Sequence, residues 1–251
     1  MTTPPFITLT GIDDTTSLQS ILEFSSRYRL AGQYHPGLVE WGVLYSLTRQ
    51  GNGRYPALAT IDKFAAASEA SGGPNFALHI CGRAVADFIA GTGHVSEVVG
   101  SFQRVQINLR AADHDIDALA FRLSQHPSRS FITQHNAANA SLWHALAGQR
   151  NHAALFDDSG GRGEIRQSWP APLPGVLCGY AGGLGPGTLA TELPRIHQAA
   201  AGARYWLDME GRLRDAQDRF DLSRAHICLE IASRFFADHV ATARRQTLAT
   251  V

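Results

Sequence analysis

Cysteine is scarce in this sequence, and the cysteines that occur form no pairs. The 251-residue chain contains three of them, Cys81, Cys178 and Cys228, which are widely spaced and include no Cys-x-x-Cys motif. An odd, scattered set predicts neither a disulfide framework nor a zinc site. The composition favours a reducing compartment, and we expect a cytoplasmic protein.

The sequence also lacks an excess of charge and a long apolar run. Its 22 basic residues balance 22 acidic ones, giving a formal net charge of +0. No stretch approaches the roughly 18 apolar residues of a membrane span, and the opening Met-Thr-Thr-Pro-Pro does not resemble a signal peptide. We therefore expect no nucleic-acid partner and no membrane partner, and any anion binding has to be local.

Sequence motifs of common cofactor and catalytic sites are missing as well. The glycines of residues 182–187 lack the full spacing of a dinucleotide-binding turn, and there is no Walker loop, GxSxG elbow or HExxH motif. His79 and Cys81 are conceivable metal ligands, but no third ligand stands at a known spacing. We expect neither a cofactor nor a metal.

The sequence does contain a regular alternation of strand and helix candidates, which is typical of repeated βα units. Over this length it predicts a single-domain (β/α)8 TIM barrel spanning residues 1–251; a doubly wound open sheet is the alternative, because its local pattern is the same. The strand candidates are residues 6–10, 39–46, 76–81, 104–109, 130–135, 153–157, 175–180 and 203–209. The helix candidates are residues 18–28, 60–71, 84–90, 115–124, 140–147, 189–201 and 222–242.

Local signals mark where some helices begin and where one is missing. Thr16 or Ser17 is a candidate cap for the first helix, Thr60 for the second, and Asp221 or Ser223 for the last. The proline-rich residues 170–174 predict a loop that replaces part of the helix between the sixth and seventh strands.

Polar residues and glycines gather at the predicted strand ends, which meet at one mouth in a barrel. Residues 154–163 and 176–187 both run from an apolar strand into glycines. Because glycine lets a ligand approach the backbone closely, these two ends predict an anion site. The polar strand residues are Thr8, Thr10, Glu40, His79, Cys81, Gln106, Asn108, Gln134, His135, Asn136, Asp157, Asp158, Asp208 and Glu210.

Several motifs in the last third of the chain follow a recognisable order. They are Leu155-Phe-Asp with Gly160-Gly-Arg-Gly163, Ala181-Gly-Gly-Leu-Gly-Pro186, Leu207-Asp-Met-Glu-Gly211 and Phe220-Asp-Leu, preceded by weaker echoes in Gly53-Arg-Tyr and Val105-Gln-Ile. In these motifs the chain resembles the phosphoribosylanthranilate isomerases of tryptophan biosynthesis. The resemblance implies a (β/α)8 barrel that converts an N-phosphoribosyl aryl amine into a 1-deoxyketose by acid and base catalysis, without a cofactor.

The resemblance also implies roles for individual residues. Asp157, or Asp158 beside it, would be the general acid, Arg54 would bind a carboxylate on the aromatic half of the substrate, and Gly182 with Gly183 would bind the phosphate. Taken by itself, either aspartate can instead cap the glycine turn. Further substrate-binding candidates are Gln106, His79, Gly160, Gly161, Asp208 and Gly211.

The chain departs from the family at the first strand, where Thr10 occupies the position of a cysteine that acts as general base. A threonine hydroxyl has no useful basicity near neutral pH, so Thr10 needs another base to activate it. Cys81 is one replacement: His79 lies on the same strand face, and a neighbouring imidazolium would favour the thiolate. Cys81 can equally be a small buried apolar residue.

The eighth loop also departs, because Glu210 stands where the family has serine. A carboxylate facing a bound phosphate is repulsive, so either Glu210 points away or the ligand is no phosphate, unless Arg212 or Arg162 compensates for the charge. Three hypotheses follow: an isomerase with a rearranged base, a related barrel with a different proton-transfer or lyase reaction on a small anionic substrate, or a non-catalytic binding protein. A homodimer also stays open.

Overall fold

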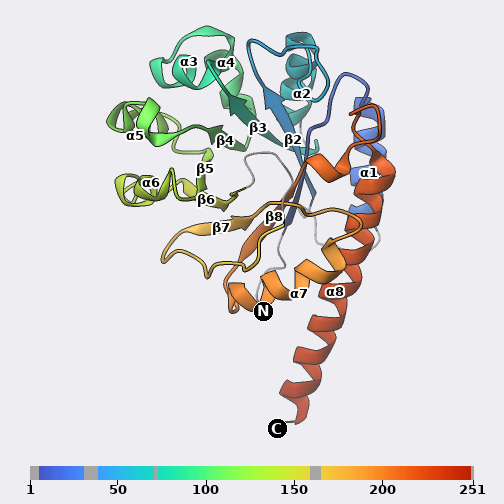
Figure 1. The fold of residues 1–251 in the computed structure, drawn as a ribbon. Helices are drawn as coiled ribbons and strands as arrows, with labels where there is room; N and C mark the ends of the chain where they lie inside the picture. Colours follow the sequence, from blue (N-terminus) through green and yellow to red (C-terminus); the bar gives the residue numbers. More distant parts are fainter. Residues whose placement is uncertain (1–5, 31–38, 71–72, 159–164, 250–251) are drawn as a thin grey trace.

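The structure is a computed structural model of the chain and describes residues 6–30, 39–70, 73–158 and 165–249. Eight parallel strands form a closed barrel in sequence order, with β8 paired back to β1 (Figure 1). This closure confirms the predicted (β/α)8 barrel and rules out the open sheet. The strands are β1 (Phe6–Thr10), β2 (Val39–Tyr45), β3 (Asn75–Cys81), β4 (Arg104–Asn108), β5 (Ser130–His135), β6 (His152–Phe156), β7 (Leu177–Tyr180) and β8 (Tyr205–Met209).

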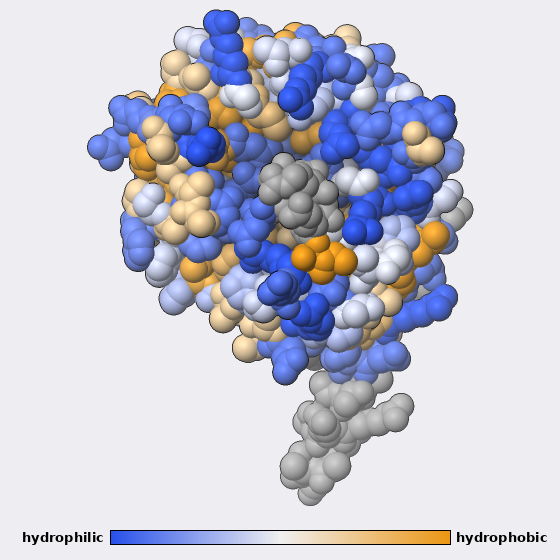
Figure 2. All heavy atoms as spheres, in the orientation of Figure 1, coloured by the Kyte–Doolittle hydropathy of each residue, from blue (hydrophilic) through white to orange (hydrophobic). Residues whose placement is uncertain are grey.

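Helices surround the strands on the outside of the barrel, and hydrophilic side chains predominate on the face seen in Figure 2. The described residues between β6 and β7 contain no helix, as the proline-rich segment predicts. No described helix is both long and apolar enough to span a membrane. The helices are α1 (Leu18–Leu30), α2 (Leu58–Glu69), α3 (Ala84–Ala90), α4 (Gly93–Val98), α5 (Ile116–Ser124), α6 (Ala140–Ala145), α7 (Leu189–Ala200) and α8 (Leu222–Ala249), with short 3₁₀-helices at Val99–Ser101, Ala111–Asp113 and Gly211–Leu213.

Two of the predicted helix caps are confirmed and one is wrong. The Asp221 carboxylate accepts the backbone N–H of Ser223 at 2.8 Å, and the Ser17 hydroxyl accepts that of Ser20 at 3.0 Å. Thr60 caps nothing, because α2 begins at Leu58, two residues before it. The Asp14 carboxylate instead holds the backbone N–H of Ala57, which precedes this helix, at 3.1 Å.

Replacing Asp221 by alanine should lower the free energy of unfolding by about 1 kcal/mol, because the first turn of α8 loses its cap. Urea denaturation measures the change. The control is Glu230→Ala, farther along the same helix, with an expected change within about 0.5 kcal/mol. Equal effects of the two substitutions would show that the cap contributes nothing specific.

A charged pair and aromatic rings fill the amino-terminal end of the barrel interior. The Arg104 guanidinium lies 2.8 Å from the Glu40 carboxylate, which also accepts the Thr8 hydroxyl at 2.8 Å. The same guanidinium lies 4.3 Å from the ring centroid of Trp206 and 4.6 Å from that of Phe6. All five residues are buried, so we call them the barrel floor. Glu40 and Thr8, two of the polar strand residues, are thus part of the internal packing.

Glycines inside two strands make room for this interior. A Cβ at Gly179 in β7 would lie 2.2 Å from the Trp206 indole, and a Cβ at Gly42 in β2 would lie 2.4 Å from the Thr10 hydroxyl. Both distances are far below van der Waals contact, so any side chain there would displace a buried neighbour. Gly42 therefore lets Thr10 turn toward β8.

Candidate active site

A cavity of about 970 Å³ lies at the carboxyl ends of the strands. It is lined by the last residues of several strands and by the loops that follow them, which is where (β/α)8 barrels carry their active sites. Thr10 and Asp158 do not line it, and Gly160, Gly161 and Arg162 lie outside the described residues. The sequence-predicted residues that do line it are Arg54, His79, Cys81, Gln106, Asn108, Gln134, Asp157, Gly182, Gly183, Asp208, Glu210, Gly211 and Arg212.

Asp208 lies near the end of β8, beside β1. The Thr10 hydroxyl donates a 2.7 Å hydrogen bond to Oδ1 of Asp208, while Oδ2 is buried without a hydrogen-bond partner among the described residues. Burial raises the pKa of Asp208 to about 8, and the negative charges of Glu210 and Glu40 add to this, against the lowering effects of the Thr10 hydrogen bond and Arg104. The Asp208 carboxyl therefore holds its proton near neutral pH.

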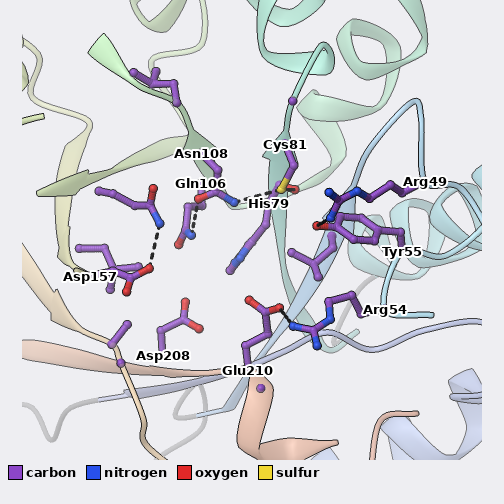
Figure 3. A pocket seen from close by; sticks show the side chains of 18 of the residues that line it. Arg49, Arg54, Tyr55, His79, Cys81, Gln106, Asn108, Asp157, Asp208 and Glu210 are labelled. Carbon is purple, nitrogen blue, oxygen red and sulfur yellow. Dashed lines mark hydrogen bonds and ion pairs between the residues drawn. The ribbon is translucent and has the colours of Figure 1, made fainter. Parts of the chain in front are cut away.

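Cys81 and His79 project from β3 into the same cavity (Figure 3). Burial and the Arg104 charge lower the pKa of His79 to about 3, so its imidazole is neutral. Burial also raises the pKa of the Cys81 thiol to about 11, although the Asn108 amide donates to its sulfur at 3.1 Å. Burial therefore disfavours an imidazolium at His79 and a thiolate at Cys81, and favours the alternative in which Cys81 is a small buried residue.

Gln106 in β4 lies beside His79 of β3 and adds a second polar side chain to this side of the cavity. Its Nε2 donates to Oδ1 of Asn108 at 2.8 Å, while its Oε1 is buried and has no hydrogen-bond partner within the described part of the chain. His79 Nε2 is unpartnered in the same way. Strands β3 and β4 thus carry one unpartnered acceptor, Gln106 Oε1, and one unpartnered ring nitrogen, His79 Nε2. Whether this nitrogen donates or accepts depends on the tautomer.

The two adjacent aspartates after β6 point to different places. Asp157 is buried and lines the cavity, and Gln134 Nε2 donates to its Oδ2 at 2.9 Å (Figure 3). The Asp158 side chain is 56% exposed and pairs with Arg166. Side chains alternate in direction along a strand, and this alternation continues past the end of β6 at Phe156. Asp157 therefore turns inward and Asp158 turns out to solvent. Of the two candidates for a general acid, Asp157 faces the cavity.

The glycine-rich loop after β7 and the loop after β8, which contains Gly211, form the wall beside Asp157 and Asp208. Gly182 and Gly183 have φ angles of 111° and 65°, a backbone region that favours glycine. The Thr188 hydroxyl donates to the Gly183 carbonyl at 2.7 Å and fixes this turn before α7. Gly185 packs against Arg212 of the following loop, where a Cβ would lie 2.4 Å from the arginine side chain. The two loops are thus held against each other.

Arg54, on the loop after β2, is already paired with carboxylates of this chain. Its Nη1 lies 2.6 Å from Glu210 Oε1, and its Nη2 lies 3.0 Å from Asp218 Oδ1 (Figure 3). The family resemblance implies that Arg54 binds a carboxylate of the substrate, which would have to compete with these two partners. Glu210 lines the cavity rather than pointing away, and Arg54 offsets its charge.

Several cavity residues carry no sequence signal. Arg49, Arg83 and Arg110 come from the loops after β2, β3 and β4, and none of them forms an ion pair with another described residue. The Arg49 guanidinium lies 5.4 Å from the ring centroid of Tyr55, another lining residue. They lie in loops without a motif, so only the closed barrel brings them to the mouth. No group of three His, Cys, Asp or Glu side chains within the described ranges could hold a metal ion.

Comparisons with known proteins find similar structures at low sequence identity. No protein-family model matches the chain, and no curated protein matches it. TrpF from Jonesia denitrificans is similar with a TM-score of 0.59 and 14% identity, over 91% of this chain and 96% of that one. The phosphoribosylanthranilate isomerase from Thermus thermophilus has a TM-score of 0.57 and 13% identity, over 92% and 99%.

A third solved structure gives the same result. It contains monomers generated from the dimeric phosphoribosylanthranilate isomerase of Thermotoga maritima, with a TM-score of 0.56 and 12% identity, over 91% of this chain and 98% of that one. The resemblance in the sequence motifs is thus confirmed at the level of the fold, along nearly the whole chain. The reaction has to be argued from the cavity itself.

Proposed function

We propose that this protein isomerises a small phosphorylated sugar amine from an aldose to a ketose by acid and base catalysis. One observation carries the proposal: the carboxyl groups of Asp157 and Asp208, both buried, line the same cavity as the glycines that follow β7 and β8. Pairs of carboxyl groups in different surroundings are typical of acid/base catalysis. The fold shared with phosphoribosylanthranilate isomerases makes N-phosphoribosyl anthranilate the substrate to test first.

Asp157 is the proposed general acid, which protonates the ring oxygen of the sugar. Gln134 holds Oδ2 of its carboxyl group, which fixes the direction in which the other oxygen points. Opening the ring breaks the bond between C1 and the ring oxygen, and the electron pair of the amine nitrogen forms a C1=N bond. A carboxyl group in a fixed orientation is suited to deliver its proton to one atom.

The proposed phosphate site is the wall formed by Gly182, Gly183 and Gly211. Glycines leave the backbone open to a ligand, and backbone N–H groups are common phosphate donors. Arg212, on the same wall, supplies a positive charge that none of the described carboxylates neutralises in an ion pair. Arg49, Arg83 and Arg110 lie on the β2 to β4 side of the cavity, where they would attract a second anionic group of the substrate.

A different proton-transfer or lyase reaction on a small anionic substrate is the second candidate. It is favoured by the pairing of Arg54 with Glu210 and Asp218, because this removes the cation that the resemblance assigns to the aromatic carboxylate. A substrate without that carboxylate would leave the ion pairs intact. The two carboxyl groups, Asp157 and Asp208, would serve such a reaction equally well.

The fluorescence of phosphoribosylanthranilate tests the first candidate, because isomerisation removes it. Purified protein should produce a loss of fluorescence that is proportional to enzyme concentration. No turnover by the parent protein would overturn the isomerase proposal. Thermal stabilisation by other small phosphorylated sugars would then favour the second candidate, and no stabilisation by any of them would count against an anionic substrate.

Substituting glutamine for Glu210 should tighten the binding of inorganic phosphate. The change removes a carboxylate from the cavity and frees the Arg54 guanidinium, which lies 2.6 Å from it. Removing one repulsive charge of this kind corresponds to a roughly five- to tenfold lower Kd. Isothermal titration calorimetry measures it, with Glu230→Gln on α8, outside the cavity, as the control. An unchanged Kd would place the phosphate site away from Glu210.

A further inference from the structure

Three buried polar atoms without a partner among the described residues belong to side chains that line the cavity. They are His79 Nε2, Gln106 Oε1 and Asp208 Oδ2, carried by β3, β4 and β8. The three side chains reach the cavity from different strands (Figure 3). Buried polar atoms are normally hydrogen-bonded, so an unpartnered set at one cavity is suited to receive polar atoms of a ligand.

Asp208 carries the carboxyl group among these three side chains, and it lies next to the position where the family has its general base. Strand β8 pairs with β1, and Thr10 at the end of β1 donates its hydroxyl to Asp208 Oδ1 at 2.7 Å. Thr10 is the residue that replaces the basic cysteine of the resembling family. The Asp208 carboxyl group therefore lies on the strand next to the position of the family's cysteine, and it is hydrogen-bonded to Thr10, which occupies that position.

The hydrogen bond also determines which oxygen is available. Thr10 occupies Oδ1, and Gly42 leaves the space that Thr10 needs for this orientation. Oδ2 has no partner within the described ranges. Thr10 is thus a positioning residue, and Oδ2 is the Asp208 oxygen that we assign to proton transfer.

We propose that Asp208 is the catalytic base that removes the C2 proton of the sugar amine, in place of a first-strand cysteine. This inference rests on the proposed isomerase function. After Asp157 has opened the ring, Asp208 Oδ2 takes the proton from C2, the C–H electrons form a C1=C2 bond, and the electrons of the C1=N bond return to nitrogen. The product of this step is a neutral enolamine.

The second half of the reaction restores both carboxyl groups. Asp208 returns its proton to C1, the C1=C2 electrons form the new C1–H bond, and the enol oxygen becomes the C2 carbonyl as it releases its proton. That proton reaches Asp157 through solvent. Asp157 and Asp208 end in their starting states, so the isomerisation needs neither an oxidant nor a reductant.

The charges around Asp208 suit this role. Burial raises the pKa of Asp208 most strongly, and the charges of Glu210 beyond β8 and Glu40 on β2 raise it further. Arg104 on β4 lowers it, and the resulting pKa is about 8. His79 on β3 is neutral, since its pKa is about 3. A desolvated carboxylate with this pKa binds a proton more tightly than a solvated one and is therefore a stronger base.

The test compares full-length wild-type protein with Asp208→Asn and Asp208→Glu in the phosphoribosylanthranilate fluorescence assay. We expect kcat to fall about 10²- to 10⁴-fold in Asp208→Asn and to recover in part in Asp208→Glu. The Kd for inorganic phosphate at neutral pH should stay within about threefold, because the Asp208 carboxyl is protonated there and its replacement by a neutral amide changes no charge. In wild type, kcat/KM should rise with pH and level off above about pH 8, once the base is ionised.

Two further measurements separate catalysis from a structural role. Thr10→Val should move the midpoint of the pH profile upward, since it removes a hydrogen bond that lowers the Asp208 pKa. Substrate deuterated at C2 should react more slowly with wild type. Circular dichroism verifies that each variant is folded.

The outcomes distinguish this inference from the proposed function. An active wild type with Asp208→Asn retaining turnover within about threefold overturns the role of Asp208 alone. A wild type that does not turn over phosphoribosylanthranilate overturns both. If Asp208→Asn does not fold, an active Asp208→Glu whose pH profile matches that of wild type, with no isotope effect in either protein, also overturns the assignment.

Discussion

Asparagine in place of Asp157 is expected to lower kcat for phosphoribosylanthranilate about 10²- to 10⁴-fold, the range that a general acid contributes. The amide has no acidic proton to give to the ring oxygen. The substitution keeps the shape of the side chain, and the oxygen of the new amide can still accept the hydrogen bond that Gln134 donates at 2.9 Å. Ring opening should therefore be lost while the local structure is kept.

Asp158 provides a matched control for this experiment. It is the neighbouring residue, has the same functional group, and points to solvent beside Arg166. Asp158→Asn should keep kcat within about threefold of wild type. If Asp158→Asn is the inactive variant and Asp157→Asn the active one, the turn after β6 presents the other aspartate in the working enzyme, and our assignment of the acid is wrong.

The Asp208→Asn protein should become progressively more stable than wild type as the pH rises. A carboxyl group with the ordinary pKa of 3.8 in the unfolded chain loses its proton well below neutral pH, whereas folded Asp208 keeps it up to about pH 8. Between these values the unfolded state binds fewer protons, so the stability of wild type falls with rising pH. Asparagine does not ionise in either state and removes this dependence.

The expected size of the effect is large. The difference in the free energy of unfolding should grow by up to about 1.4 kcal/mol per pH unit and level off above about pH 8, for a total of several kcal/mol. Urea denaturation at a series of pH values from about 5 to 9 measures it. Asp117→Asn, on the exposed surface of α5, is the control and should show little trend. A difference that does not depend on pH would mean that Asp208 is ionised in the folded protein.

The strands could be predicted because their signal is local. A buried parallel strand is a short apolar run that ends in polar residues or glycine, and β1 and β5 lie where the sequence predicts them. The missed helix α4 has no such signal. It is six residues long, and its buried Val95 and Val98 pack into the core, so tertiary contacts rather than helix propensity stabilise it.

The site could be predicted only as far as strand position determines it. Thr10 and Asp208 are 198 residues apart, and Arg54 and Asp218 are 164 apart, so their pairing depends on the closure of the barrel. The charge states of His79 and Cys81 depend on burial, which the alternation of side chains along one strand does not reveal. The unpartnered Asp208 oxygen, on which our inference rests, is visible only in three dimensions.

The barrel floor affects how a small molecule can enter and leave the cavity. The Glu40–Arg104 pair and the rings of Phe6 and Trp206 block the amino-terminal end of the interior, below the cavity. Among the described residues, the barrel floor therefore closes the interior below the cavity, opposite the mouth. In the proposed reaction, the product would leave through the mouth by which the substrate enters, so product that accumulates would compete with substrate for the cavity.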